Sequence, residues 1–165
     1  MNLQDGRRIS EIEDLILDPD SGRLLAYLIS GRRLFGPKRI LTAPDLREVS
    51  TDVGIIDSPE VLTDPEEVVR VAEVLSQKIR LIGTPVVTES GTVLGKLRDY
   101  AVDVLSHRLE RINVRGNPLS SELIITADQI LRIERSRVTV RDAAVPETAA
   151  GENLERARVT PPEPA

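Results

Sequence analysis

The stretch GRRISEIEDLILDPDSGRLLAYLISG, residues 6–31, recurs in altered form as GTVLGKLRDYAVDVLSHRLERINVRG, residues 91–116. At an offset of 85 positions, seven of the 26 places carry the same residue: Gly6 and Gly91, Asp14 and Asp99, Asp18 and Asp103, Ser21 and Ser106, Arg23 and Arg108, Leu24 and Leu109, and Gly31 and Gly116. Chance would give about two identities at ordinary residue frequencies. We therefore interpret the chain as two divergent copies of one unit.

The repeat continues beyond this stretch after a deletion of one residue. At an offset of 84, Ile40, Thr42 and Ala43 match Ile124, Thr126 and Ala127. Within each copy, short apolar runs separated by turn residues predict strands. Several short strands in about 55 residues are typical of a small barrel or rolled sheet. The sequence thus predicts a mainly β protein with two small open antiparallel barrels, one in residues 1–60 and one in residues 83–142.

A different kind of segment, residues 61–82, lies between the copies. Thr63-Asp64-Pro65-Glu66 has the form of a helix start, with a capping residue, an early proline and an acidic first turn. Apolar residues then recur at helical spacing from Val68 to Ile79. We expect one amphipathic helix over 65–79, which joins the two barrels.

The last stretch, residues 143–165, reads AAVPETAAGENLERARVTPPEPA and holds four of the eleven prolines. It has almost no large apolar side chains, so it cannot bury enough apolar surface to offset its ordering entropy. The composition predicts a disordered tail.

Composition excludes several classes of function. The aromatic residues are only Tyr27, Tyr100 and Phe35, which rules out an aromatic base-stacking platform. The chain has no cysteine and a single histidine, His107, so a thiolate site, a histidine metal cluster and a Ser-His-Asp triad cannot form within it. We expect no cofactor and no metal, and we do not expect the protein to be an enzyme.

Charge and hydropathy indicate where the protein works. Twenty-two basic against 27 acidic residues give a net charge of -5, which disfavours RNA binding by bulk electrostatics. No apolar run approaches the roughly 18 residues that span a bilayer, and the N-terminal residues lack a signal-peptide hydrophobic region. We expect a soluble, cytoplasmic protein.

Two pairs of aspartates occupy the same places in both copies: Asp14 with Asp99, and Asp18 with Asp103. Paired carboxylates can act in acid-base catalysis. Their repetition favours a structural turn, in which the carboxylate accepts hydrogen bonds from backbone N–H groups. Asp18-x-Asp20-x-Gly22 resembles a calcium loop only superficially, because its glycine comes one place early.

Two surfaces are candidates for contacts with partners. Ala26 and Leu28 are apolar where the second copy carries Arg111 and Asn113. This strand face is either covered within the chain, by the linking helix or the other copy, or exposed as a protein or dimer interface. The loop that carries Arg32, Arg33, Lys38 and Arg39 is the most concentrated basic patch. It is either a solvated loop or a contact for RNA or an acidic protein.

The segment Gly91-Thr-Val-Leu-Gly95-Lys-Leu97-Arg-Asp99 resembles the opening of a PRC-barrel domain. The first copy offers Gly6-Arg-Arg-Ile9-Ser10-Glu-Ile12-Glu-Asp14, in which Ser10 replaces the second glycine. The stretches Leu41–Val49 and Ile125–Ile133, each followed by a short strand, are similar to the closing part of the family pattern. A glycine usual after the second aliphatic residue is absent from both copies.

The resemblance implies a small, open, mostly antiparallel β-barrel without catalytic residues. The family includes the cytoplasmic part of the photosynthetic reaction centre H subunit and the C-terminal domain of the ribosome maturation factor RimM, which dock on proteins. It therefore implies a non-enzymatic adaptor or assembly module whose protein partners are unknown. The alternatives are an accessory factor in RNA processing or ribosome assembly and, third, a small-ligand binder between the two barrels. The sequence leaves homodimer formation open.

Overall fold

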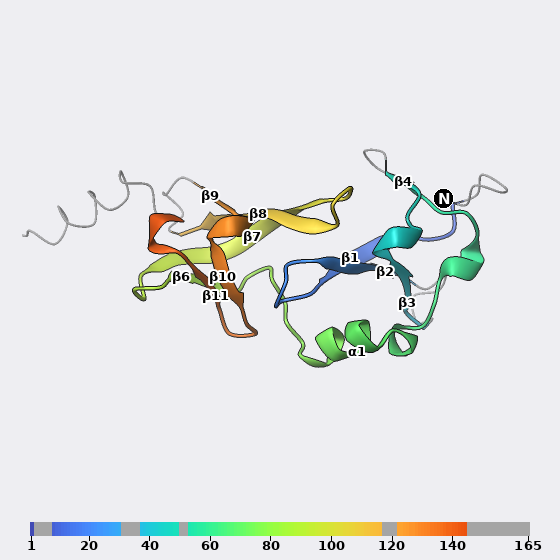
Figure 1. Cartoon of the computed structure of the whole chain (residues 1–165), viewed down its shortest axis with the longest axis horizontal. Coiled ribbons are helices and arrows are strands. Elements are labelled where there is room, and N and C mark those ends of the chain that lie inside the picture. Colours follow the sequence, from blue (N-terminus) through green and yellow to red (C-terminus); the bar gives the residue numbers. More distant parts are fainter. Residues whose placement is uncertain (2–7, 31–36, 50–52, 117–121, 145–165) are drawn as a thin grey trace, which may run out of the picture.

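The computed structural model describes residues 1, 8–30, 37–49, 53–116 and 122–144. Two β units lie side by side along the longest axis of the molecule, and the segment between them runs beneath the first unit (Figure 1). The arrangement is mainly β, with open sheets and a single α-helix in the described part of the chain. The predicted fold class is confirmed.

The first unit contains a three-stranded antiparallel sheet and a separate two-stranded ribbon. The sheet has the order β1-β2-β3, with β1 at one edge. A short 3-10 helix, Ala43–Asp45, leads from the sheet to the ribbon. The strands are β1 (Ile12–Leu17), β2 (Leu24–Ile29), β3 (Arg39–Thr42), β4 (Glu48–Val49) and β5 (Gly54–Ile55).

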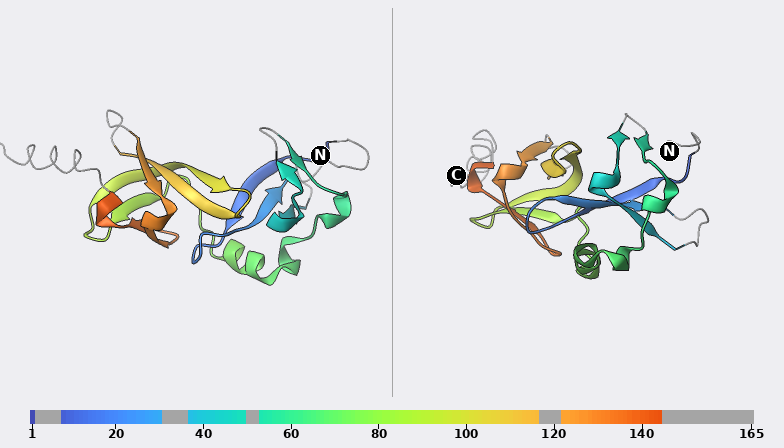
Figure 2. Two further views of the ribbon diagram at one scale, coloured as in Figure 1. Left: turned by 45° about the horizontal axis from the view of Figure 1, so that its top comes forward. Right: turned by 45° about the vertical axis from the view of Figure 1, so that its right-hand side comes forward.

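The second unit is a single six-stranded sheet with the order β10-β11-β6-β7-β8-β9. All neighbours pair antiparallel except β11 and β6, which are parallel. The sheet is strongly curved and forms an open barrel (Figure 2). Its strands are β6 (Pro85–Thr88), β7 (Val93–Asp103), β8 (Arg108–Arg115), β9 (Leu123–Thr126), β10 (Ile130–Ile133) and β11 (Val138–Val140).

Equivalent elements recur at the offsets found in the sequence. Strands β3 and β9 begin 84 residues apart, as do the 3-10 helices Ala43–Asp45 and Ala127–Gln129. The strands β1 and β2 correspond to parts of β7 and β8 at an offset of 85. The chain is therefore a tandem repeat in structure as well as in sequence.

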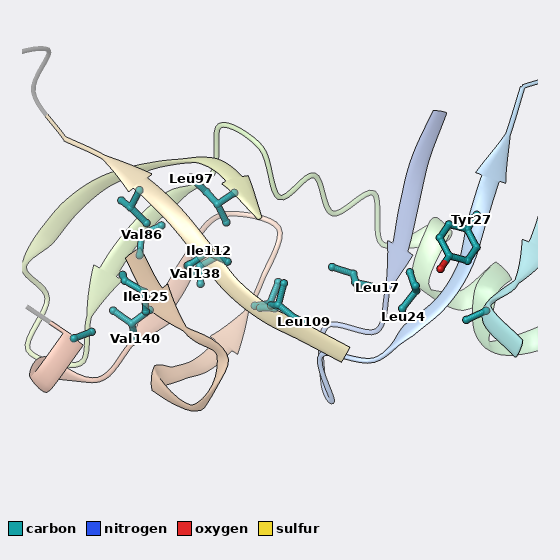
Figure 3. Close-up of a cluster of buried hydrophobic side chains, with 14 of the residues drawn as sticks. Leu17, Leu24, Tyr27, Val86, Leu97, Leu109, Ile112, Ile125, Val138 and Val140 are labelled. Atoms are coloured by element: carbon teal, nitrogen blue, oxygen red, sulfur yellow. The ribbon is translucent and has the colours of Figure 1, made fainter. Parts of the chain in front are cut away.

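The barrel of the second unit is filled by aliphatic side chains. Val86, Leu97, Ile112, Val138 and Val140 are all fully buried, because alternate residues of each strand point inward (Figure 3). The same interior in the first unit is less well covered. Ile12, the equivalent of Leu97, and Val49, the equivalent of Ile133, are each 45% exposed.

The linking segment is helical in two pieces. A 3-10 turn, Pro65–Glu67, precedes the α-helix α1 (Val69–Ser76), and the extended backbone of Val68 separates them. The predicted helix over 65–79 is thus too long at both ends. Lys78 adopts a φ of 53°, which is incompatible with continuation of the helix.

The two units meet tip to tip through the turn after β1 and the turn after β7. The Leu24 N–H donates to the His107 carbonyl at 2.9 Å, and the Leu109 N–H donates to the Gly22 carbonyl at 2.8 Å. Because these partners are equivalent at an offset of 85, the contact has local pseudo-two-fold symmetry. Leu24 and Leu109 belong to one continuous apolar core that spans both units.

The described chain ends in a 3-10 turn, Asp142–Ala144, whose last residue is only 7% exposed. The predicted tail therefore starts too early, because Ala144 packs on the core. The rest of that prediction, residues 145–165, lies outside the described residues. Of the helices in the described ranges, none has the length and apolar character needed to cross a membrane.

Candidate functional site

A cavity of about 1000 Å³ lies at the junction of the two units and the linking segment. We call it the inter-repeat cleft. One wall is the edge strand β1, a second is the end of α1 with residues 78–85, and the third comes from Tyr100, Ile133 and Arg135 of the second unit. A volume of this size is at the upper end of the range for ligand pockets.

Apolar side chains make the floor and part of the rim of the inter-repeat cleft. Leu15 and Leu28 of the first unit are partly exposed there. Leu75 of α1 is 38% exposed, and Ile82 beyond the helix is 54% exposed. Large aliphatic side chains left open in a concave surface are typical of a binding site.

A partly buried tyrosine, Tyr100, and an aspartate, Asp14, face each other across the cleft. The Tyr100 hydroxyl donates to the Asp14 carboxylate at 3.4 Å, and the Leu15 N–H donates to the same oxygen at 2.8 Å. Burial, the charge of Asp14 and this hydrogen bond raise the pKa of Tyr100 to about 12. The phenol therefore stays protonated near neutral pH and ties the two units together.

Four cationic side chains line the same cleft: Lys38, Lys78, Arg80 and Arg135. Lys38 is neutralised by Glu13, with 2.8 Å between its ammonium nitrogen and the carboxylate. Within the described ranges, no carboxylate lies at ion-pair distance from Lys78, Arg80 or Arg135. The cleft thus combines an aliphatic floor with exposed positive charge.

The repeated aspartates lie at equivalent positions in the two copies. Asp18 accepts a hydrogen bond from the Ser21 hydroxyl at 2.7 Å, and Asp103 accepts one from Ser106 at 2.8 Å. Asp99 accepts from the backbone N–H of Tyr100, as Asp14 does from that of Leu15. The turn prediction holds for Asp18 and Asp103 only, because Asp14 and Asp99 lie within β1 and β7, each next to a shift in the pairing register. Of the four carboxylates, only Asp14 lines the cleft.

Asp18 has an additional partner in the helix. Arg70 of α1 contacts Asp18 at 2.5 Å and Asp20 at 2.6 Å. These ion pairs hold α1 against the turn between β1 and β2. Burial raises the pKa of Asp18, but the hydrogen bonds from Ser21 and Arg70 outweigh it, so that the pKa is lower than usual.

The proposed interface at Ala26 and Leu28 needs correction. Ala26 has no exposed surface, because Val71 and Val74 of α1 pack on it together with Ile16. The apolar strand face is therefore covered by the linking helix and is not open to a partner at Ala26. Leu28 is partly exposed and lines the cleft.

Of the four cations of the basic loop, Lys38 and Arg39 lie within the described residues. Arg32 and Arg33 lie outside the described residues. Arg39 lies 3.3 Å from the Asp64 carboxylate and donates to the Leu62 carbonyl, while Lys38 pairs with Glu13. The two described cations of this loop are thus each matched by a carboxylate of the chain itself.

Sequence reasoning missed the cationic part of the cleft. Lys78 and Arg80 lie in the linking segment, whereas Arg135 lies more than fifty residues later, in the second unit. The one available signal was the basic and apolar run Lys78-Ile-Arg-Leu-Ile82, which begins at the end of the predicted helix. Its significance depends on the placement of the second unit, which the pattern does not contain.

Comparison with known proteins places the chain in a family. No curated protein matches the sequence. The family model described as the PRC-barrel domain matches residues 3–62 and 80–145, one segment for each structural unit. Together these segments cover most of the chain, and the tandem open β units have the fold that the resemblance implied. The chain belongs to the PRC-barrel domain family, of which it carries two tandem copies.

Proposed function

We propose that this protein is a non-enzymatic protein-binding module, an adaptor or assembly factor, and that it holds its partner in the inter-repeat cleft. The observation that carries the proposal is the cleft itself, in which the first unit and the linking segment contribute exposed aliphatic side chains and the second unit adds Tyr100 and Arg135. A tandem repeat creates such a site only at its junction, so the site would be a property of the two-unit chain.

The chemistry of the cleft supports binding rather than catalysis. A general acid or base works best with a pKa near the working pH, whereas the pKa of Tyr100 is raised to about 12. Among the residues that the structure describes, no cluster of histidine and acidic side chains could hold a metal ion. The polar groups of the cleft are thus suited to recognition.

The proposal is tested by affinity capture with the full-length chain as bait, in lysate of the cells that make it. The cleft variant carries Leu75→Asp and Ile82→Asp, at two exposed positions where a charge leaves the core intact. The control variant carries Val93→Asp and Leu105→Asp, which are 69% and 91% exposed and lie outside the cleft.

The expected result is a polypeptide that the wild type and the control variant retain after nuclease treatment and that the cleft variant loses. Circular dichroism and melting curves confirm that the variants are folded. Capture of RNA that disappears with nuclease would instead support the accessory role in RNA processing or ribosome assembly. Equal retention by all three proteins would overturn the assignment of the cleft.

A further inference from the structure

We infer that the segment bound in the inter-repeat cleft is acidic, an extended peptide whose carboxylates face Lys78, Arg80 and Arg135 while its apolar side chains meet the aliphatic floor. This inference rests on the proposed function and specifies the partner's chemistry. It is argued from charge, from the shape of the cleft and from the sheet edge that borders it.

Three cationic side chains, Lys78, Arg80 and Arg135, give the cleft its positive charge. All three are exposed at the rim of the cleft and are left without a carboxylate in the described part of the chain. The Asp14 carboxylate, the acidic group in the lining, is already engaged by Tyr100 and the Leu15 amide. The rim therefore presents unneutralised positive charge on a protein whose net charge is -5. Such a local reversal of sign favours an anionic partner.

The strand β1 borders the cleft along one side. This strand is an edge of the sheet β1-β2-β3, and five residues from Asp14 to Pro19 line the cleft. A peptide in extended conformation can run beside an edge strand and alternate its side chains between two faces. Carboxylates on one face and aliphatic groups on the other would match the rim and the floor.

The floor distinguishes a peptide from RNA. Leu75, Ile82 and Leu28 offer aliphatic contact surface. Among the described residues that line the cleft, the one aromatic ring is the phenol of Tyr100, which is bonded to Asp14. Single-stranded RNA is held chiefly by stacking on aromatic side chains. Acidic peptide is the occupant that uses both the charge and the aliphatic surface.

The test uses the full-length protein and a fluorescein-labelled peptide of about eight residues, in which glutamate and leucine alternate. Three further probes are the same peptide with lysine for glutamate, the same peptide with glutamine for glutamate, and a single-stranded RNA of mixed sequence. Binding is followed by fluorescence anisotropy at low and at moderate salt. The variant K78E/R80E/R135E removes the rim charge.

The matched control is K96E/R98E/R115E, which changes the net charge equally at three exposed residues of β7 and β8 outside the cleft. We expect the glutamate peptide to bind at least about tenfold more tightly than the lysine peptide, a difference of about 1.4 kcal/mol. The cleft charge variant should lose this preference, whereas the control variant should keep most of it.

The outcomes separate the two claims. If the glutamine peptide binds as well as the glutamate peptide and L75D/I82D abolishes both, the cleft binds peptides but the acidic preference is wrong. Tighter binding of RNA than of the glutamate peptide overturns the inference, as does an equal effect of the two charge variants. If no peptide binds and the cleft variant captures the same polypeptides as wild type, both the inference and the proposed function fail.

Discussion

At the scale of single residues, the two copies place different residues at the same left-handed backbone position. The turn after each hairpin strand needs a left-handed residue, which is Gly22 with a φ of 66° in the first copy and His107 with a φ of 53° in the second. Glycine adopts this conformation without strain, whereas a residue with a Cβ does not. At the second glycine of the family pattern the copies also differ. A Cβ on Gly95 would collide with the Arg115 backbone, while Ser10 in the first copy is accommodated and bonds to Ser30.

His107→Gly should therefore stabilise the protein. Relief of the left-handed strain exceeds the added entropy of the unfolded chain, which gives an expected gain of about 0.5–1 kcal/mol. The reverse change, Gly22→Ala, is the control and should destabilise by about 1 kcal/mol, because its Cβ finds room 3.7 Å from Leu109 and only the backbone is strained. Urea denaturation measures both. A lower midpoint for His107→Gly would contradict the symmetry of the two turns.

Asp18→Asn should weaken the turn and its link to Arg70. The loss of charge-assisted hydrogen bonds predicts a fall in Tm of about 2–4 °C at neutral pH, or about 1 kcal/mol for a chain of this size. Because the pKa of Asp18 lies below its ordinary value of 3.8 in the folded protein, its contribution is complete well above that value and is lost as the pH falls through the lowered pKa.

Melting curves between pH 7 and pH 3 test the sign of this effect. The gap between wild type and Asp18→Asn should be widest near neutral pH and should narrow in acid. Asp20→Asn, at a carboxylate that is 79% exposed, is the control and should change Tm less. A gap that widens on acidification would show that the carboxylate is not stabilised by these partners.

At the scale of elements, α1 makes the two copies unlike each other. On the first copy it covers a face whose residues Ile16, Ala26 and Ile40 are buried. On the second copy the equivalent of Ile40 is Ile124, which is 62% exposed. Val71 and Val74 therefore act as core residues of the first unit, and the helix is held by packing because eight residues form too short a helix to be stable alone.

Val71→Ala should destabilise the protein by about 2 kcal/mol, because Val71 is 1% exposed and its removal leaves a small cavity under α1. Val69→Ala on the same helix is the matched control. Val69 is 74% exposed, so this change should alter stability by less than about 0.5 kcal/mol. Equal midpoints for the two variants in urea would show that the helix does not pack on the sheet.

At the scale of the whole molecule, the pairing of the two turns decides how the units sit. Arg23 and Arg108 face each other as antiparallel partners, and their neighbours make the two inter-unit hydrogen bonds. Partners of this kind have Cα atoms about 4.5 Å apart, which lies within the usual range for a disulfide. The junction also determines the cleft, since it sets the distance from α1 and β1 to Tyr100 and Arg135.

The double variant Arg23→Cys and Arg108→Cys should close an intramolecular disulfide on oxidation. The chain has no other cysteine, so the product is unambiguous by mass and by its mobility without reductant. Closing so long a loop should raise stability by up to about 4 kcal/mol relative to the reduced form. The single variant Arg23→Cys is the control. Disulfide-linked dimers, with no intramolecular product, would contradict the tip-to-tip contact.

The sequence by itself determined the tandem repeat, the β class, the strand-rich units and the linking helix. Each depends on local patterns, on alternation within strands and on helical spacing, and self-similarity at a fixed offset reveals the duplication directly. The helix boundaries were less well predicted. The structure has a 3-10 turn at Pro65–Glu67 and an extended residue at Val68, where helical spacing predicted a continuous α-helix.

Only the tertiary structure decided which apolar face is covered and where a cleft opens. The alternation of Ala26 and Leu28 shows an apolar outer face, but the burial of Ala26 depends on where α1 packs, and the pattern allowed either outcome. Lys78, Arg80 and Arg135 become neighbours of one cleft through the turn-to-turn pairing of the units. That pairing is made by backbone hydrogen bonds, which every residue except proline can donate, so the side chains from which a sequence is interpreted give little sign of it.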